Sequence, residues 1–295
     1  GGVAAGAAGA EGVVSPESLC LCFDFDGVVC DSVNESTVAA WKHARELWPD
    51  LDVGESPDVF LEPMRKVRPV VETGWENTVL VRVLAEAGLP TPGGGRSREE
   101  EIDLVTEAVL QGWDAMLKRN VEAWGLDREQ MIREYGEVRD RWIAAEMGVW
   151  LGWNRAYDAV PEVLGAMVAS GAEVFIITTK QRRFCRALLD HFGLGGIAED
   201  RLFALEDGPK AGVLRGLLGR AELAGRAFHF VEDKLGNLLK VRAEPGLESV
   251  SLHFASWGYN TASDRDAVEG GEVAGVQLLS PGALRRLGGA GAWLA

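Results

Sequence analysis

The chain has 295 residues, of which 47% are hydrophobic and 25% charged, and its formal net charge is −15. This profile is typical of a globular protein with a substantial core, in one large domain or two smaller ones. The acidic balance argues against nucleic acid and anionic membrane surfaces as partners, although a local site can still bind a small anion. No apolar run approaches the roughly 18 residues of a transmembrane helix.

The glycine- and alanine-rich start of the chain has no basic region and no long apolar region, so it does not resemble a secretory signal. We expect residues 1–17 to form a flexible N-terminal tail, a pattern compatible with a cleaved transit peptide. The cysteines are too few and too unevenly spaced for a disulfide framework or a zinc site: Cys20, Cys22, Cys30 and Cys185. They are predicted to be buried reduced thiols, which suits a reducing compartment.

An apolar run at residues 19–25 predicts the first strand. From residue 33 to residue 154 every pattern is helical, with helices expected at 33–47, 69–88, 99–125 and 127–150. The segment 58–67 contains Pro63 and is expected to be short or broken. Residues 91–99 are expected to form a flexible loop. Seven tryptophans of this region, at positions 41, 48, 75, 113, 124, 142 and 150, are expected to pack between helices rather than to stack on a ligand.

After residue 154 the patterns alternate between strand and helix. Strands are predicted at 173–179, 201–206, 226–233 and 249–255, with helical segments between them. Such alternation predicts an α/β fold with a parallel sheet covered on both faces. The α/β core would comprise residues 18–32 and 155–295, interrupted after its first strand by an all-helical insert over residues 33–154.

Two aspartates stand where the first strand ends, in the stretch FDFDGVVCDS. Because residues two apart in an extended chain point the same way, Asp24 and Asp26 are predicted to be neighbours. Two carboxylates so close need a cation or a shared proton. A turn after a capping residue accounts for Asp26 but leaves Asp24 unexplained at the end of a buried strand. A functional role is therefore favoured.

Other polar residues follow the later strands. Thr178 and Thr179 end the second strand, where a hydroxyl and free helix amides form an anion site, although ordinary helix capping also explains them. Lys210 is predicted near a helix start, which is unfavourable for a lysine unless an anion is close. Asp233 ends the fourth strand, and with Asp24 on an adjacent strand it offers the oxygen ligands that Mg²⁺ takes.

These motifs, in this order, resemble those of the haloacid dehalogenase-like superfamily of phosphohydrolases. FDFDGVVCDS is similar to its first motif, DxDGxxxDS, and Thr178 and Lys210 fall where the second and third motifs lie. The acidic pair of FVEDKLGN resembles the fourth motif, and WGY at 257–259 resembles the segment after the fifth strand. The insert lies where the family's C1-type cap lies. The resemblance implies a Rossmann-like parallel-sheet core.

The resemblance also implies an activity, that of a Mg²⁺-dependent phosphatase acting on a small phosphorylated metabolite. Asp24 would be the nucleophile that forms an aspartyl-phosphate. Asp26 would be the general acid and then the general base, with a pKa held near neutral by the charge of Asp24. Thr178 would hold phosphate oxygens and Lys210 would offset developing charge. Mg²⁺ would bind Asp24, the carbonyl oxygen of Asp26, and Asp233.

One departure from the family pattern concerns the metal. The common fourth motif, GDxxxD, is here Glu232-Asp233-xxx-Asn237, so an amide replaces the second acid. Glu232 is the candidate to supply the missing charge. A phosphomutase, or a catalytically weak scaffold or complex subunit, remains an alternative to the phosphatase.

The segment RPVVETGWEN at residues 68–77 resembles chloroplast-type plant and algal members of the family. This points to the chloroplast stroma, and otherwise to the cytoplasm. We expect Arg68, Glu72 and Trp75 of this segment, with Thr179 of the core and Arg65 as a further candidate, to contact the substrate. A solvated helix face with one packing tryptophan explains the segment equally well.

Overall fold

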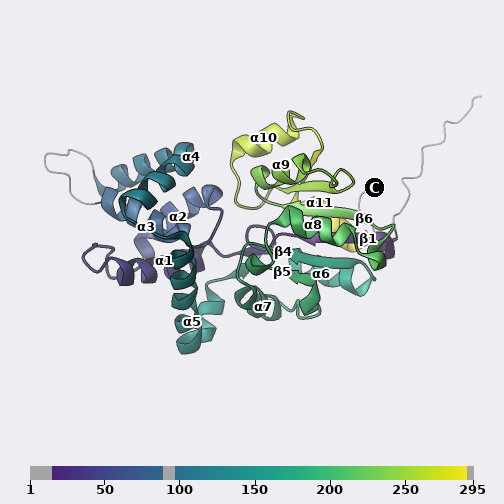
Figure 1. The fold of residues 1–295 in the computed structure, drawn as a ribbon, viewed down its shortest axis with the longest axis horizontal. Helices are drawn as coiled ribbons and strands as arrows, with labels where there is room; N and C mark the ends of the chain where they lie inside the picture. The colour runs from purple at the N-terminus through teal and green to yellow at the C-terminus, as the bar shows by residue number, and fades with distance from the viewer. Residues whose placement is uncertain (1–14, 89–96, 291–295) are drawn as a thin grey trace, which may run out of the picture.

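The computed structural model describes residues 15–88 and 97–290 and comprises a helical part and an α/β core (Figure 1). The predictions for residues 1–14 and for much of the loop at 91–99 lie outside the described residues. The strands are β1 Leu19–Phe23, β2 Cys30–Asp31, β3 Arg155–Ala156, β4 Glu173–Ile177, β5 Leu202–Phe203, β6 Ala227–Glu232, β7 Ser251–Ala255 and β8 Val276–Leu279.

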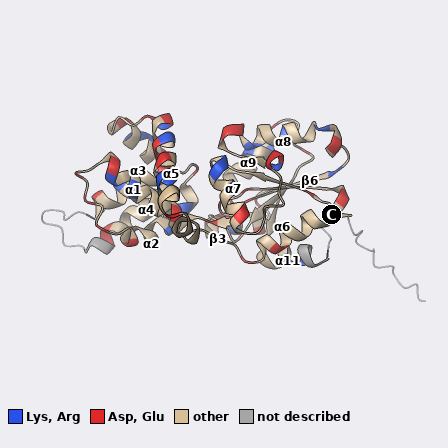
Figure 2. Ribbon diagram, turned by 90° about the horizontal axis from the view of Figure 1, so that it is seen from below, with Lys and Arg blue, Asp and Glu red and all other residues tan. Residues whose placement is uncertain are grey.

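The α-helices are α1 Val33–Leu47, α2 Asp58–Val67, α3 Glu76–Ala87, α4 Arg98–Ala123, α5 Arg128–Gly152, α6 Val160–Ala169, α7 Arg182–His191, α8 Lys210–Leu218, α9 Leu235–Ala243, α10 Ala262–Glu269 and α11 Pro281–Ala290. Short 3₁₀ helices occupy Pro16–Ser18, Arg68–Val70, Glu199–Arg201, Leu205–Asp207 and Ala221–Leu223. Charged residues of both signs lie on the helices of both parts (Figure 2).

The core sheet has six parallel strands in the order β5-β4-β1-β6-β7-β8. β1 is central, and Phe23 pairs with Ile176 of β4 on one side and with Val231 of β6 on the other. After β1 the chain first forms β4 and β5 on one side of it, and then returns to form β6, β7 and β8 on the other side. In sheets of this kind, ligands bind in the crevice at the carboxyl ends of the strands where the order reverses. This arrangement confirms the predicted α/β class.

Both faces of the sheet are buried, which explains why the strands read as continuous apolar runs. Alternate residues of β1 enter two separate hydrophobic cores. Leu21 and Phe23 pack with α6, α7 and α11, whereas Cys20 and Cys22 pack with α8 and α9. The four cysteines are buried and free, as predicted.

The helical part is inserted between β1 and α6. The two chain crossings run side by side, because β2 pairs with β3 in a two-residue antiparallel ladder. Across the described residues of 33–154 there is no strand, so the all-helical insert is confirmed. All eight of its tryptophans belong to the hydrophobic core or pack against it, and Trp75 also faces the cavity described below.

The segment 58–67 forms a short helix, one of the two outcomes expected for it: α2 has ten residues and continues through Pro63. Other local predictions were wrong. α3 begins at Glu76, since a 3₁₀ turn and a loop occupy the preceding residues that were predicted helical. The edge strand β8 and the β2–β3 ladder were not predicted, because runs of two to four residues carry little periodicity. No helix among the described residues is long and apolar enough to cross a membrane.

Candidate active site at the carboxyl edge of the sheet

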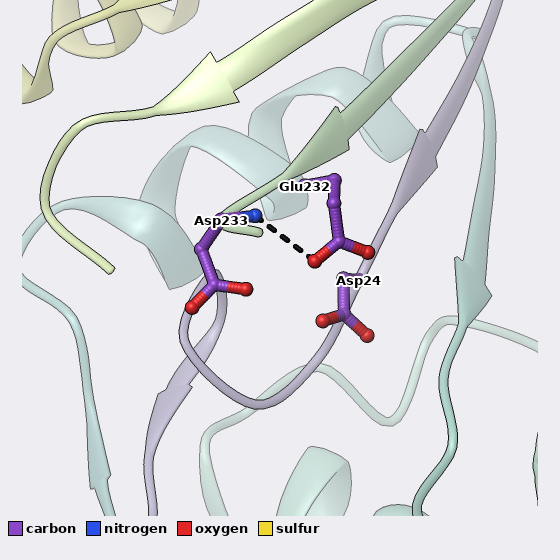
Figure 3. Close-up of side chains that lie close together, drawn as sticks. All are labelled: Asp24, Glu232 and Asp233. Atoms are coloured by element: carbon purple, nitrogen blue, oxygen red, sulfur yellow. Dashed lines mark hydrogen bonds between the residues drawn. The ribbon is translucent and has the colours of Figure 1, made fainter. Parts of the chain in front are cut away.

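Three carboxylates meet where β1 and β6 end. Asp24 directly follows β1, and its backbone N–H donates to the Val231 oxygen at 2.9 Å, which continues the ladder. Glu232 is the last residue of β6, and Asp233 follows it. Each residue offers an oxygen, and these oxygens lie within 4.8 Å of one another (Figure 3). The predicted meeting of Asp24 and Asp233 is therefore confirmed, and Glu232 joins them.

Lys210, the first residue of α8, connects two of these carboxylates. Its Nζ lies 2.8 Å from Asp24 Oδ1 and 2.5 Å from Glu232 Oε2. Burial opposes the lysine charge, but the two acids outweigh it and raise the pKa of Lys210. Burial likewise opposes ionisation of Glu232, yet Lys210 lowers the pKa of that carboxyl. These anions explain how a lysine is stable at a helix start.

One lysine does not neutralise three buried acids. Burial and the neighbouring Glu232 raise the pKa of Asp24 to about 7, against the opposing effect of Lys210. Burial, Glu232 and Asp24 raise the pKa of Asp233 well above its usual value. Moreover, Asp233 Oδ1 is buried without a hydrogen-bond partner. A buried oxygen of this kind needs a ligand, and an all-oxygen donor set suits Mg²⁺.

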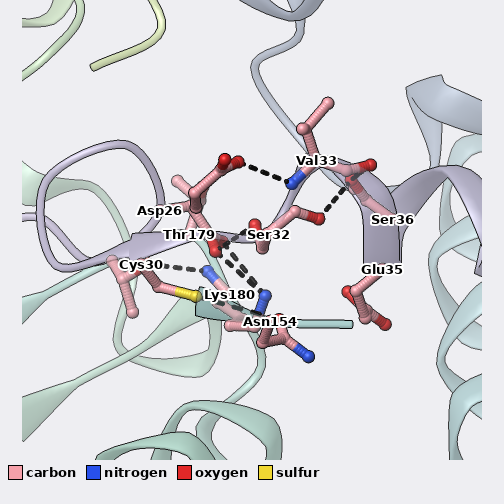
Figure 4. A network of polar contacts seen from close by, with 12 residues as sticks. Asp26, Cys30, Ser32, Val33, Glu35, Ser36, Asn154, Thr179 and Lys180 are labelled. Carbon is pink, nitrogen blue, oxygen red and sulfur yellow. Dashed lines mark hydrogen bonds and ion pairs between the residues drawn. The ribbon is translucent and has the colours of Figure 1, made fainter. Parts of the chain in front are cut away.

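Asp26 does not belong to this cluster of carboxylates, because it has a cationic partner of its own. Lys180 Nζ donates to Asp26 Oδ1 at 3.0 Å and Oδ2 at 3.2 Å, and Ser32 Oγ donates to Oδ1 at 2.6 Å (Figure 4). Burial favours the neutral acid, but Lys180, Arg68 and Ser32 outweigh it and lower the pKa of Asp26. The expectation of a near-neutral pKa for free Asp26 was therefore wrong, because Lys180 acts more strongly than Asp24.

The two threonines after β4 differ in what they face. Thr179 lines the cavity, and its hydroxyl donates to the Glu72 carbonyl oxygen of the helical part at 3.3 Å. Thr178 is buried, does not line the cavity, and accepts a hydrogen bond from the Lys180 amide at 3.1 Å. In this geometry Thr178 shapes the turn that presents Lys180, rather than contacting the cavity itself as predicted.

Two glycines and one tyrosine fix the position of Asp233. Gly27 has φ +92°, and a Cβ added there would lie 1.9 Å from Asp233 Oδ2. A Cβ at Gly258 would lie 2.2 Å from Asp233 Cβ. The backbone N–H of Tyr259 donates to Asp233 Oδ2 at 2.6 Å. The loop after β1 and the WGY segment after β7 therefore close around one carboxylate, leaving its other oxygen free.

A cavity of about 60 Å³ lies between the helical part and these strand ends. The predicted residues Arg68, Glu72 and Trp75 line it together with Asp24 and Asp26. Asn237 also lines it. Arg65 does not, since its guanidinium donates to Asp31 at 3.0 Å and to Asn34 at 3.0 Å. The structure thus brings three of the four candidates from the helical part to the site.

Sequence reasoning missed several residues of this cavity. Lys180 follows a strand end, so the rule that found Asp24 would also have found it. Lys234 directly follows Asp233, and a basic residue next to an acidic one is the usual pattern of a solvent-exposed surface. Tyr135 and Arg139 lie in the middle of α5, and no local pattern separates them from packing residues.

The parallel sheet has helices on both faces, and a cluster of carboxylates and lysines lies at the carboxyl ends of its strands. Together these features define an α/β protein with a site of the kind found in enzymes. The chain belongs to the haloacid dehalogenase-like hydrolase family, whose model matches residues 19–245. Similarity to solved structures supports the fold. A predicted phosphoglycolate phosphatase from Haemophilus somnus 129PT is 14% identical, with a TM-score of 0.50, covering 83% of this chain and 88% of that chain.

Two further structures have the same fold. A predicted phosphatase from Clostridium acetobutylicum is 14% identical, with a TM-score of 0.51, covering 91% of this chain and 97% of that chain. A haloacid dehalogenase-like family protein from Streptococcus pneumoniae is 15% identical, with a TM-score of 0.50, covering 92% and 97% of the two chains. A search of curated proteins gave no significant match.

Proposed function

We propose that this protein is a Mg²⁺-dependent phosphatase that hydrolyses a small phosphorylated metabolite through an aspartyl-phosphate on Asp24. The observation that carries the proposal is the position of Asp24, 2.8 Å from Lys210 and within an acidic cluster whose Asp233 oxygen lacks a partner. A nucleophilic carboxylate must meet an anionic phosphate, and such a meeting requires nearby positive charge.

The reaction would proceed in two displacements. An Asp24 oxygen attacks phosphorus, the ester P–O bond breaks, and the proton of Asp26 goes to the leaving oxygen. Asp26 is ionised in the free site, so it must take up this proton from solvent as the substrate binds, because a phosphate dianion beside Asp26 adds negative charge that raises the pKa of the carboxyl. Ionised Asp26 then accepts a proton from water as the water attacks phosphorus, which frees Asp24 and inorganic phosphate.

Lys210 and Lys180 assist different atoms. Lys210 contacts Asp24 and would stabilise negative charge on the phosphoryl group. Lys180 contacts Asp26 and would hold this carboxylate in position for both proton transfers. Mg²⁺ would be held by Asp24 and Asp233, with the Asp26 carbonyl oxygen as a further ligand and Glu232 or Asn237 nearby. When bound, it reduces repulsion between the acids and the phosphate.

The helical insert, residues 33–154, would act as a cap that closes over the site. Contacts between the two parts support this proposal. Lys234 donates to the backbone oxygens of Pro69 and Val71, and Arg183 donates to Asp140 at 2.7 Å through two nitrogens. A closed cap excludes water while the covalent intermediate forms. The chloroplast-type affiliation and a location in the chloroplast stroma stay predictions.

The test is Mg²⁺-dependent phosphate release from p-nitrophenyl phosphate by the purified protein. We expect turnover with Mg²⁺, none in excess chelator, and recovery when Mg²⁺ is added back. Asp24→Asn should abolish turnover while leaving the circular dichroism spectrum unchanged. Absence of phosphate release by the wild-type protein across a panel of phosphomonoesters would favour the scaffold alternative, and isomerised phosphate esters without phosphate release would favour a mutase.

A further inference from the structure

Within the described part of the chain, five cationic side chains line the cavity, and three of them already have carboxylate partners. Lys210 contacts Asp24, and Lys180 contacts Asp26. The third pair is Arg139 with Glu35, in which two guanidinium nitrogens donate to the two carboxylate oxygens at 2.8 and 2.7 Å. These three cations are therefore largely neutralised before any ligand enters.

The remaining two cations are Arg68 of the helical part and Lys234 of the core. Among the described residues, neither forms an ion pair with a carboxylate. Both donate to the same backbone oxygen, that of Val71, Arg68 through Nη1 at 3.1 Å and Lys234 through Nζ. Lys234 also donates to the Pro69 oxygen at 2.8 Å. Two positive charges thus converge on one neutral carbonyl.

Arg68 is short of partners as well as of counter-charge. The residue is only 8% exposed, and its Nε–H is buried without an acceptor. One face of the guanidinium lies on the Tyr259 ring, 4.2 Å from the ring centroid, so the group is held in place. A buried guanidinium with an unused donor beside a second cation is unfavourable unless an anion completes the arrangement.

Two further polar atoms in the same cavity wall lack partners. Trp75 Nε1 is a buried donor, and Asn77 Oδ1 is a buried atom of an amide whose Nδ2 is already used by the Gly74 oxygen, at 2.8 Å. Both residues line the cavity with Arg68. A compact polar ligand could form hydrogen bonds with both atoms, whereas an aryl or alkyl group would leave both atoms without partners.

We propose that Arg68 and Lys234 bind a carboxylate on the leaving group, so that the substrate is a small phosphorylated carboxylic acid. Trp75 Nε1 and Asn77 add hydrogen bonds to its remaining polar atoms. The phosphoryl group lies at Asp24 and Lys210, and the second anion lies against the helical part. This inference rests on the proposed phosphatase function.

The test measures binding rather than turnover, so its failure is distinct from failure of the proposed function. In an Asp24→Asn background with Mg²⁺, titration calorimetry compares 3-phosphoglycerate with glycerol 3-phosphate, which differ by a carboxylate in place of a hydroxymethyl group. A hydrogen bond to a charged group contributes about 1.5–3 kcal/mol, so we expect about a tenfold or greater preference for 3-phosphoglycerate.

Arg68→Gln should reduce this preference to less than about threefold, mainly by weakening the carboxylate probe, and Arg68→Lys should retain part of it. Lys66→Gln is the control for charge removal, since Lys66 pairs with Asp103 on the surface. Thermal melts verify that each variant is folded. If Arg68→Gln weakened the binding of both probes equally, the two cations would act on the phosphoryl group, and the proposal would be overturned. Tighter binding of propane-1,3-diol bisphosphate than of 3-phosphoglycerate would overturn the carboxylate assignment.

Discussion

Lys180 donates to both carboxylate oxygens of Asp26, at 3.0 and 3.2 Å, and so joins the loop after β4 to the loop after β1. The lysine side chain is 2% exposed and the aspartate side chain 19% exposed. A lysine in this position orients the carboxylate that the proposed mechanism uses twice, and it keeps that carboxylate ionised in the free site.

Replacing Lys180 by Gln should lower phosphate release at least about tenfold and destabilise the fold by about 2 kcal/mol, because Asp26 loses its partner in a largely buried site. Steady-state kinetics and urea unfolding measure the two effects. Lys180→Arg should recover part of the stability. Lys66→Gln, which removes a surface lysine paired with Asp103, should change neither quantity. Wild-type turnover in Lys180→Gln would contradict the positioning role.

A second prediction concerns the buried ion pair of Glu35 and Arg139, which links α1 to α5. Glu35 is fully buried and also accepts from Trp150 Nε1 at 2.9 Å. Arg139→Met leaves that carboxylate without a cation and should destabilise the protein by about 3–5 kcal/mol. The double variant with Glu35→Gln should recover much of the loss in urea unfolding. A double variant no more stable than Arg139→Met would refute the ion-pair explanation.

The third prediction is a pH dependence of stability. His229 and His253 lie side by side in the sheet, with ring nitrogens 3.0 Å apart. Burial lowers the pKa of His229 to about 4, and burial together with His229 lowers the pKa of His253 to about 3. Below the unfolded pKa of 6.5 the unfolded chain binds more protons, so stability is complete above that pH and falls as the pH drops toward 4 and below.

Because a shift of one pKa unit corresponds to 1.36 kcal/mol, the loss should be about 3 kcal/mol for His229 alone near pH 4. Urea unfolding at a series of pH values measures it. His253→Gln should flatten the dependence, whereas His191→Gln on the exposed end of α7 should leave it unchanged. Equal slopes in His253→Gln and the wild type between pH 6.5 and 4 would argue against this assignment.

The approach of Asp24 to Asp233 could be predicted, because both follow apolar strands and neighbouring parallel strands end at one edge. The same rule predicted that Lys210 lies near this edge. What could not be predicted depends on packing between distant segments. Arg68 reaches the site because the helical part folds back over the sheet. Lys234 is shielded from solvent for the same reason, and nothing in the local sequence distinguishes it from a surface lysine.

The fourth prediction tests how tightly the loop after β1 fits Asp233. Gly27→Ala introduces a methyl group where the Asp233 carboxylate lies, at φ +92°, and should abolish Mg²⁺-dependent turnover. Gly54→Ala is the matched control, since Gly54 has φ +69° but the nearest atom to a Cβ added there, the Ser56 oxygen, is 3.9 Å away. The control should lose about 1 kcal/mol of stability and keep its activity. Similar activity in both variants would show that the close approach is unimportant.

The central claim is that Asp24 carries the phosphoryl group, and chemical trapping tests it most directly. Borohydride reduces an acyl phosphate to an alcohol, so quenching a turnover reaction should convert Asp24 to homoserine, which peptide mass spectrometry locates. We predict homoserine at position 24 in the presence of substrate and Mg²⁺, and none without substrate or in Asp24→Asn. Continued phosphate release with an unmodified Asp24, or homoserine at Asp26 or Asp233 instead, would contradict the account.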